Sequence, residues 1–219
     1  MATSGYLLCW ATATQSISVV SVESVLDNAR MYTPQAGIFA LGTSSHAYLE
    51  FDGVDPARGG ELVKAIAALR EPRTTMGGVN LVAGFRPELW RSVDPAGTPA
   101  DLTGFDEDLA GMDGFVMPAT QHDAVLWVSG SAYDVVFDVS RAAIAELSKL
   151  ATVAEETSSW PYQHDRDLTG FIDGSENPDL IDAPGLVLVP EGRPGAGGTI
   201  LLLQKWRVST KISWARMDS

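Results

Sequence analysis

The sequence predicts an α+β fold in which two helices cover one face of an antiparallel sheet. Residues 46–51, 79–85, 124–128 and 151–156 read as extended segments, from their alternation or their β-branched and aromatic content. Residues 55–69 and 132–150 carry apolar side chains at helical spacing. The resulting order is β-α-β-β-α-β, the ferredoxin-like arrangement of the dimeric α+β barrel type.

The first half begins with extended segments at 38–41 and 46–51. Asp55-Pro56 opens a helix, and its apolar stripe consists of Leu62, Val63, Ile66 and Leu69. Gly77-Gly78 then leads into the strand at 79–85. Residues 86–117 form a long connection with a short helix near 87–90, and a connection of this length usually has a function or covers something.

The second half repeats this order with a strand, a long helix and a fourth strand at 151–156. The helix places one apolar stripe toward the sheet, made of Val136, Val139, Ala143, Leu147 and Leu150. A short apolar run follows at 185–189, and residues 199–206 read as a buried strand. Residues 1–33 are hard to place, although 16–22 partly alternate like a strand.

Charge and cysteine content limit the partners and the compartment. The chain has 219 residues, a net charge of −13 and a pI of about 4.5. Such acidity argues against binding to nucleic acid or to an anionic membrane surface. Cys9 is the single cysteine, so an intrachain disulfide is excluded and a reducing compartment is expected. No apolar run reaches about 18 residues and no basic segment precedes residues 6–10, so we expect a soluble, cytoplasmic protein.

A twelve-residue stretch, 167–178, concentrates the chemistry of the chain. Asp173 stands between Gly170 and Gly174, which allow backbone conformations that a Cβ would forbid, or the close approach of a flat ligand. Asn177-Pro178 ends any regular element there. This pattern presents one carboxylate on a constrained loop, where catalytic side chains are often found. Turn formation alone would also explain an Asp beside a Gly.

Gly170-Phe171-Ile172-Asp173-Gly174, followed by Glu176-Asn177-Pro178, resembles the GxxDG signature of the dye-decolourising (DyP-type) haem peroxidases. Residues 78–85 and 118–123 also resemble stretches of that family, so the resemblance runs from about 34 to 206.

The resemblance implies a haem peroxidase that uses hydrogen peroxide to oxidise dyes or other bulky organic reductants. It implies heme b as cofactor and Asp173 as the distal acid and base that handles the proton of peroxide. The neighbouring residues of the motif would then contact the cofactor: Gly170, Phe171, Ile172, Gly174, Ser175 and Glu176.

The iron ligand that the family would place after the motif has no match in this sequence. The three histidines, His46, His122 and His164, all precede Asp173, and we assign no residue to a metal. We therefore expect an extension at 1–33, a ferredoxin-like domain at 34–163 and a motif loop with linker at 164–198. Residues 199–219 would hold the first strand of a truncated second ferredoxin-like half and a divergent tail.

Two other functions fit the same residues. A peroxidase remnant without iron would act at most as a dimerising ferredoxin-like module, since an unpaired apolar edge strand invites association, and homo-oligomerisation is open in either case. A related dimeric α+β barrel enzyme could work without a protein ligand to iron.

Overall fold

The computed structural model describes residues 4–6, 17–19, 33–71, 73–74, 77–163, 165–166, 172 and 174–207. Four long antiparallel strands form the centre of the main sheet in the order β5-β8-β3-β9. Their bounds are Ser45–Gly53 for β3, Gly77–Phe85 for β5, Ala124–Gly130 for β8 and Ala151–Ser159 for β9. Helix α1 (Gly59–Ala68) joins β3 to β5, and α3 (Tyr133–Leu147) joins β8 to β9. This is the predicted ferredoxin-like order, and the described strands form an open sheet instead of a closed barrel.

The core lies between the sheet and the helices α1 and α3. Alternate side chains of a strand point to opposite faces, and Leu49 and Phe51 of β3 point to the helical face together with Leu126 of β8. They pack against the predicted helical stripes, including Leu62 of α1 and Leu147 of α3, and all of these side chains are buried. Burial of this apolar surface is the main stabilising contribution to the domain.

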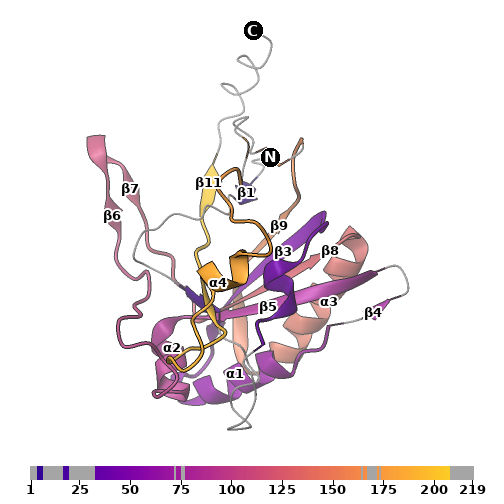
Figure 1. Ribbon diagram of the computed structural model, residues 1–219. Helices are drawn as coiled ribbons and strands as arrows, with labels where there is room; N and C mark the ends of the chain where they lie inside the picture. Colours follow the sequence, from indigo (N-terminus) through magenta and orange to yellow (C-terminus); the bar gives the residue numbers. More distant parts are fainter. Residues whose placement is uncertain are drawn as a thin grey trace.

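Shorter elements surround this sheet (Figure 1). The helices are η2 (Ala36–Phe39), η3 (Pro56–Arg58), α2 (Pro87–Val93), η4 (Met112–Gly114) and α4 (Ala183–Val187). The strands are β1 (Ser4–Tyr6), β2 (Ile17–Val19), β4 (Arg73–Thr74), β6 (Leu109–Ala110), β7 (Val116–Met117), β10 (Thr199–Leu201) and β11 (Lys205–Arg207). Strand β2 extends the sheet beyond β5 and pairs in turn with β10, while β1 pairs with β11.

The prediction of an extended segment at 38–41 is wrong, because η2 occupies Ala36–Phe39. This short helix lies on the sheet face opposite α1 and α3. The Gln35 side chain donates to the Ala83 carbonyl at 2.9 Å and accepts from the Ala83 amide at 2.8 Å. A Cβ on Gly37 would lie 2.5 Å from the Val82 side chain, so glycine allows the close approach of η2 to β5.

Two other predicted segments also differ from the structure. The apolar run at 185–189 is partly helical, because α4 covers Ala183–Val187 with a proline in its first turn. The strand predicted at 199–206 is interrupted, since β10 ends at Leu201 and β11 begins at Lys205. Ile200 is 53% exposed, so this run is only partly buried. Strand β2 covers Ile17–Val19 of the strand predicted at 16–22, and the rest of that segment lies outside the described residues.

The long connection at 86–117 contains α2 and a hairpin that the sequence analysis did not predict. Strands β6 and β7 pair, and the hairpin reaches away from the sheet in Figure 1. Its turn has positive φ at both Asp113 (57°) and Gly114 (77°), and Phe115 N donates to Met112 O at 3.1 Å.

Candidate functional site

Two isolated antiparallel β-bridges hold the backbone on the N-terminal side of Asp173. Arg166 pairs with Tyr162 and also with Ile172, so the chain reverses and returns beside itself. Arg166 N donates to Tyr162 O at 2.8 Å. Gln163 and Asp165 take positive φ angles of 38° and 63° in this reversal, a region that non-glycine residues rarely adopt. Such backbone strain is common at functional sites.

A tight turn begins directly after Asp173. Gly174 has a φ of 77°, and its carbonyl accepts from the amide of Asn177 at 3.0 Å. A Cβ at Gly174 would also lie 2.9 Å from Nδ2 of Asn177. The prediction that Gly174 takes a backbone conformation unsuited to other residues is therefore confirmed. Position 173 lies between two anchored neighbours in the sequence, the paired Ile172 and the turn at Gly174.

Three of the predicted site residues lie outside the described part of the chain: Gly170, Phe171 and Asp173. His164, to which the sequence analysis gives no role, lies outside it as well. Of the described ones, Ile172 is 57% exposed, and Gly174, Ser175 and Glu176 are exposed as well. The structure therefore places these four on the surface on both sides of position 173. Their contact with a cofactor stays a prediction.

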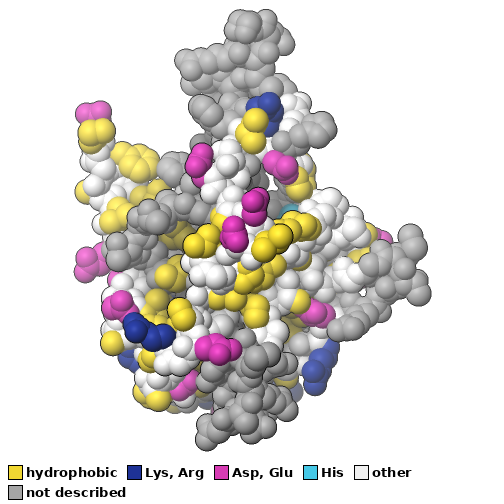
Figure 2. Space-filling model, viewed as in Figure 1, with side chains coloured by type: hydrophobic (Ala, Val, Ile, Leu, Met, Phe, Trp, Pro, Cys, Tyr) yellow, Lys and Arg dark blue, Asp and Glu magenta, His cyan; other side chains and the backbone are white. Residues whose placement is uncertain are grey.

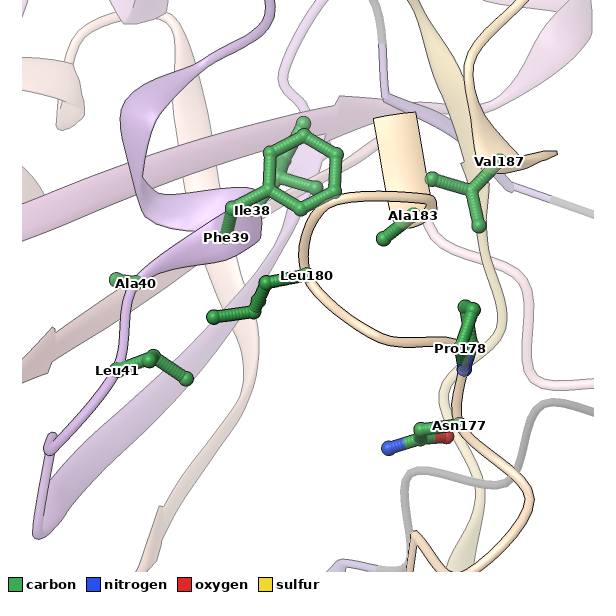
Figure 3. A pocket seen from close by; sticks show the side chains of 9 residues that line it. All are labelled: Ile38, Phe39, Ala40, Leu41, Asn177, Pro178, Leu180, Ala183 and Val187. Carbon is green, nitrogen blue, oxygen red and sulfur yellow. The ribbon is translucent and has the colours of Figure 1, made fainter. Parts of the chain in front are cut away.

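An apolar pocket adjoins the C-terminal end of the motif. It has a volume of about 130 Å³ and is formed by two segments, one around η2 and one from the motif turn to α4. Its lining residues are Ile38, Phe39, Ala40, Leu41, Asn177, Pro178, Leu180, Ala183 and Val187. Figure 3 shows the two segments facing each other, with the Asn177 amide at one end. The sequence analysis missed this pocket, because the two segments are more than 130 positions apart.

Hydrophobic side chains gather over α4 and the middle of the face shown in Figure 2. Around the pocket, Leu41 is 72% exposed, Leu180 50%, Ile181 93% and Leu186 71%. The pocket mouth therefore opens on an apolar surface that solvent reaches directly.

His46 lies on β3, within the predicted extended segment 46–51, and is partly buried. The indole Nε1 of Trp127 donates to Nδ1 of His46 at 3.1 Å, and the two rings stack with centroids 5.9 Å apart. Because an indole N–H can only donate, Nδ1 of His46 is the acceptor and the ring is neutral. Burial lowers the pKa of His46, and a backbone hydrogen bond at Thr43 offsets part of that shift. Tyr48 stacks on the same indole, with centroids 5.8 Å apart.

Charged groups cluster near the outer end of β3. His122 Nδ1 lies 3.0 Å from the Asp52 carboxylate, and Glu50, two positions before Asp52 on β3, is the register partner of Glu155 on β9. Burial raises the pKa of Glu50, and the nearby Glu155 and Asp52 raise it further, while His122 and Lys205 act in the opposite direction. Lys205 forms an ion pair with Glu155 and donates to Thr157 Oγ1 at 3.4 Å, which ties β11 to β9.

Asp123 joins three elements close to this cluster. Its Oδ2 accepts from the Gly53 amide at 2.8 Å, and its Oδ1 lies 2.6 Å from Nε of Arg86. Its backbone donates to Phe51 O and accepts from Arg86 N. The stretch at 118–123 thus has a structural role, since it fixes the ends of β3, β5 and β8 to one another.

Comparison with known proteins finds relatives among the peroxidases. The sequence profile described as "Dyp-type peroxidase, C-terminal" matches residues 164–218, a range that includes Asp173. A dye-decolorizing peroxidase of Brevibacterium linens is 31% identical over 129 residues, which is 58% of this chain and 35% of that protein. One of Mycolicibacterium paratuberculosis is 30% identical over 146 residues, 66% of this chain and 40% of that protein. A solved DypB variant of Rhodococcus jostii RHA1 in complex with heme has a TM-score of 0.60 at 26% identity, and the match covers 75% of this chain and 55% of that one.

The chain is similar to dye-decolourising (DyP-type) peroxidases over 58 to 72% of its length. Heme b is the cofactor of this family. The chain spans roughly 35 to 45% of the length of the curated relatives that it matches.

The apolar pocket beside the motif is smaller than a typical cofactor site. The pocket beside the motif has a volume of about 130 Å³, below the roughly 300–1,000 Å³ of common ligand and cofactor sites. No histidine is among its lining residues. In the described part of the chain, no group of three or more His, Cys, Asp or Glu side chains is placed to hold a metal ion. The described residues also include no helix of the length and apolar character that crossing a bilayer requires.

Proposed function

We propose that this chain carries the peroxide-handling loop of a haem-dependent peroxidase, with Asp173 as the acid and base. The observation that carries the proposal is the fixed backbone on both sides of position 173, within the range that matches the peroxidase profile. The bridge at Ile172 and the turn at Gly174 fix the backbone of the two described neighbours of position 173. A catalytic group held in one position gains rate from its orientation, and we propose this advantage for Asp173.

The chemistry proposed for Asp173 is a proton transfer between the two oxygens of hydrogen peroxide. The carboxylate accepts the proton from one oxygen, and the carboxylic acid then returns it to the other, so that water leaves. When bound, haem would supply the two electrons that the O–O bond takes up as it breaks, and the oxidising equivalents of the peroxide would then pass to the organic reductant. Asp173 must be ionised when peroxide arrives, so activity should fall as pH drops through the pKa of this carboxyl group.

A haemin titration followed by absorption tests whether the chain holds the cofactor. A saturable, sharp Soret band, with oxidation of an organic reductant that needs both haem and peroxide, would support the proposal. A broad spectrum like that of free haemin would overturn it for this chain.

A non-catalytic ferredoxin-like module is the second candidate, and one observation favours it. Neither described histidine lines the pocket beside the motif, and the Nδ1 atoms of both already contact other side chains. This candidate predicts that haemin gives no saturable band, and that self-association persists in its absence. Sedimentation of the haem-free chain across a concentration series would measure that association.

A further inference from the structure

We infer that the pocket between η2 and the segment 177–187 binds a single aromatic ring with one polar substituent, as in a simple phenol. Eight of its nine lining side chains are hydrocarbon, and Asn177 contributes the one amide. That the bound phenol is the reductant rests on the proposed peroxidase function. The binding itself does not depend on it.

The volume sets the size of the ligand. An apolar cavity of about 150 Å³ lined by Leu, Ile and Phe side chains accommodates benzene in another protein. The pocket here, at about 130 Å³, is of the same order and includes Phe39, whose ring offers an aromatic face. One ring therefore fits and a fused or biaryl dye does not, so a bulky dye would have to react from outside this pocket.

The mouth of the pocket allows entry without a conformational change. Leu41 and Leu180 belong to the lining and are 72% and 50% exposed, while Ala183 at the other side is only 6% exposed. The pocket thus has a closed end near α4 and an open rim at Leu41 and Leu180. Figure 3 shows Leu41 and Leu180 on the side away from Ala183 and Val187.

Asn177 determines the orientation in which a ligand with one polar group binds. Its side-chain amide offers both a donor and an acceptor, so it can bind a hydroxyl group in either sense. Its backbone amide is fixed on Gly174 O, which holds the residue at the end of the motif turn. A phenol bound with its hydroxyl at Asn177 would therefore hold that hydroxyl at the residue that closes the turn from Gly174.

A fluorine NMR titration of the haem-free 219-residue chain with 4-fluorophenol tests the inference. We expect saturable binding with a dissociation constant on the order of 1 mM, since a half-open pocket and a ligand of few atoms limit the affinity. Val187→Phe fills the pocket and should weaken binding at least tenfold. Leu186→Phe adds the same ring at a neighbouring residue outside the lining and should leave binding unchanged.

The role of Asn177 is tested by comparing 4-fluorophenol with 4-fluorotoluene. The wild-type chain should prefer the phenol about fivefold, the value of one net hydrogen bond. Asn177→Leu keeps the size of the side chain and should abolish this preference. If circular dichroism shows that Val187→Phe does not fold, Leu180→Ala is tested in its place. Removing this exposed side chain from the pocket lining should weaken binding at least threefold.

Absence of saturable binding, or binding that none of the pocket variants changes, would overturn the inference. These outcomes are distinct from failure of the proposed function. Phenol binding without haem-dependent turnover would remove the peroxidase role and keep the pocket. Turnover without phenol binding in the pocket would keep the peroxidase role and remove the inference about the pocket.

Discussion

At the scale of single residues, Asp123 shows how one carboxylate can hold several strand ends. It accepts from the Gly53 amide and pairs with Arg86 while only a quarter of its side chain is exposed. Asp123→Ala should lower the free energy of unfolding by about 1.5–3 kcal/mol, because a partly buried amide loses a charged acceptor. Urea unfolding measures this difference.

Asp52→Ala is the matched control for Asp123→Ala. The Asp52 side chain is 52% exposed and pairs with His122 near the surface. Removing an exposed ion pair should cost less than about 1 kcal/mol. Equal destabilisation by the two substitutions would contradict the role assigned to Asp123.

Glu50 predicts a pH dependence of stability. Burial raises the pKa of its carboxyl group in the folded chain, so the protonated form favours folding. That contribution is fully present below the unfolded value of about 4.5 and is lost as pH rises through the higher folded pKa. Glu50→Gln should therefore raise the melting temperature at pH 7–8, and the gain should vanish below about pH 4.5.

Thermal unfolding of Glu50→Gln across this pH range measures the effect, and the exposed Glu146→Gln is the control. Glu146 lies on the outer side of α3, so its substitution should leave the melting temperature nearly unchanged. A melting temperature for Glu50→Gln at or below that of the wild type at neutral pH would contradict this prediction. It would show that the ionised Glu50 carboxylate does not destabilise the folded chain.

At the scale of elements, the position of η2 depends on a single missing side chain. Gly37→Ala would place a Cβ 2.5 Å from Val82 Cγ2 and 3.0 Å from Asn80 Cβ, so η2 must move away from β5. We expect a loss of about 1–3 kcal/mol in unfolding free energy, as in other overpacked sites. Because η2 forms one wall of the pocket, the same substitution should also weaken 4-fluorophenol binding.

Gly60→Ala is the opposite case and serves as the control. Gly60 lies within α1, and a Cβ there would meet no atom within 4 Å. This substitution should stabilise the chain by about 0.5–1 kcal/mol, the helix propensity difference between alanine and glycine. If Gly37→Ala were equally neutral or stabilising, the close approach of η2 and β5 would not be a constraint.

The sequence predicts the central elements because their patterns are local. The stripes of α1 and α3 and the extended segments of β3, β5, β8 and β9 appear in short windows, and hydrophobic burial enforces them. The helix η2 is different, since Ile38-Phe39-Ala40-Leu41 suits a strand equally well. Its conformation depends on the hydrogen bond from Gln35 to Ala83, two residues that are 48 positions apart in the sequence.

The hairpin and the pocket show two further limits. Asp113-Gly114 is a sequence typical of two-residue hairpin turns, so β6 and β7 could have been predicted from it. The pocket could not, because it forms only when η2 and the segment 177–187 come together. At the motif, Gly170, Gly174 and Asn177-Pro178 together indicated a constrained loop. The structure confirms the turn conformation of Gly174, while Gly170 lies outside the described residues.

At the scale of the whole molecule, three features come together: a ferredoxin-like domain, a constrained turn in the motif and similarity to a peroxidase family. The net charge of −13 adds one expectation. Anionic reductants should approach this surface more slowly than neutral phenols, and the difference should shrink as salt screens the charge. Oxidation rates of a sulfonated and an unsulfonated phenol at low and high ionic strength would reveal it.

The most direct test of the central claim is the rate at which the haemin-loaded chain reacts with hydrogen peroxide, compared between wild type and Asp173→Asn. Asp179→Asn is the matched control, since Asp179 is an exposed carboxylate six positions further along. The account predicts a reduction of about 10²–10⁴-fold for Asp173→Asn, the usual contribution of a general acid and base, and no change for the control. Equal rates for Asp173→Asn and the wild type would contradict the claim that Asp173 handles the peroxide proton.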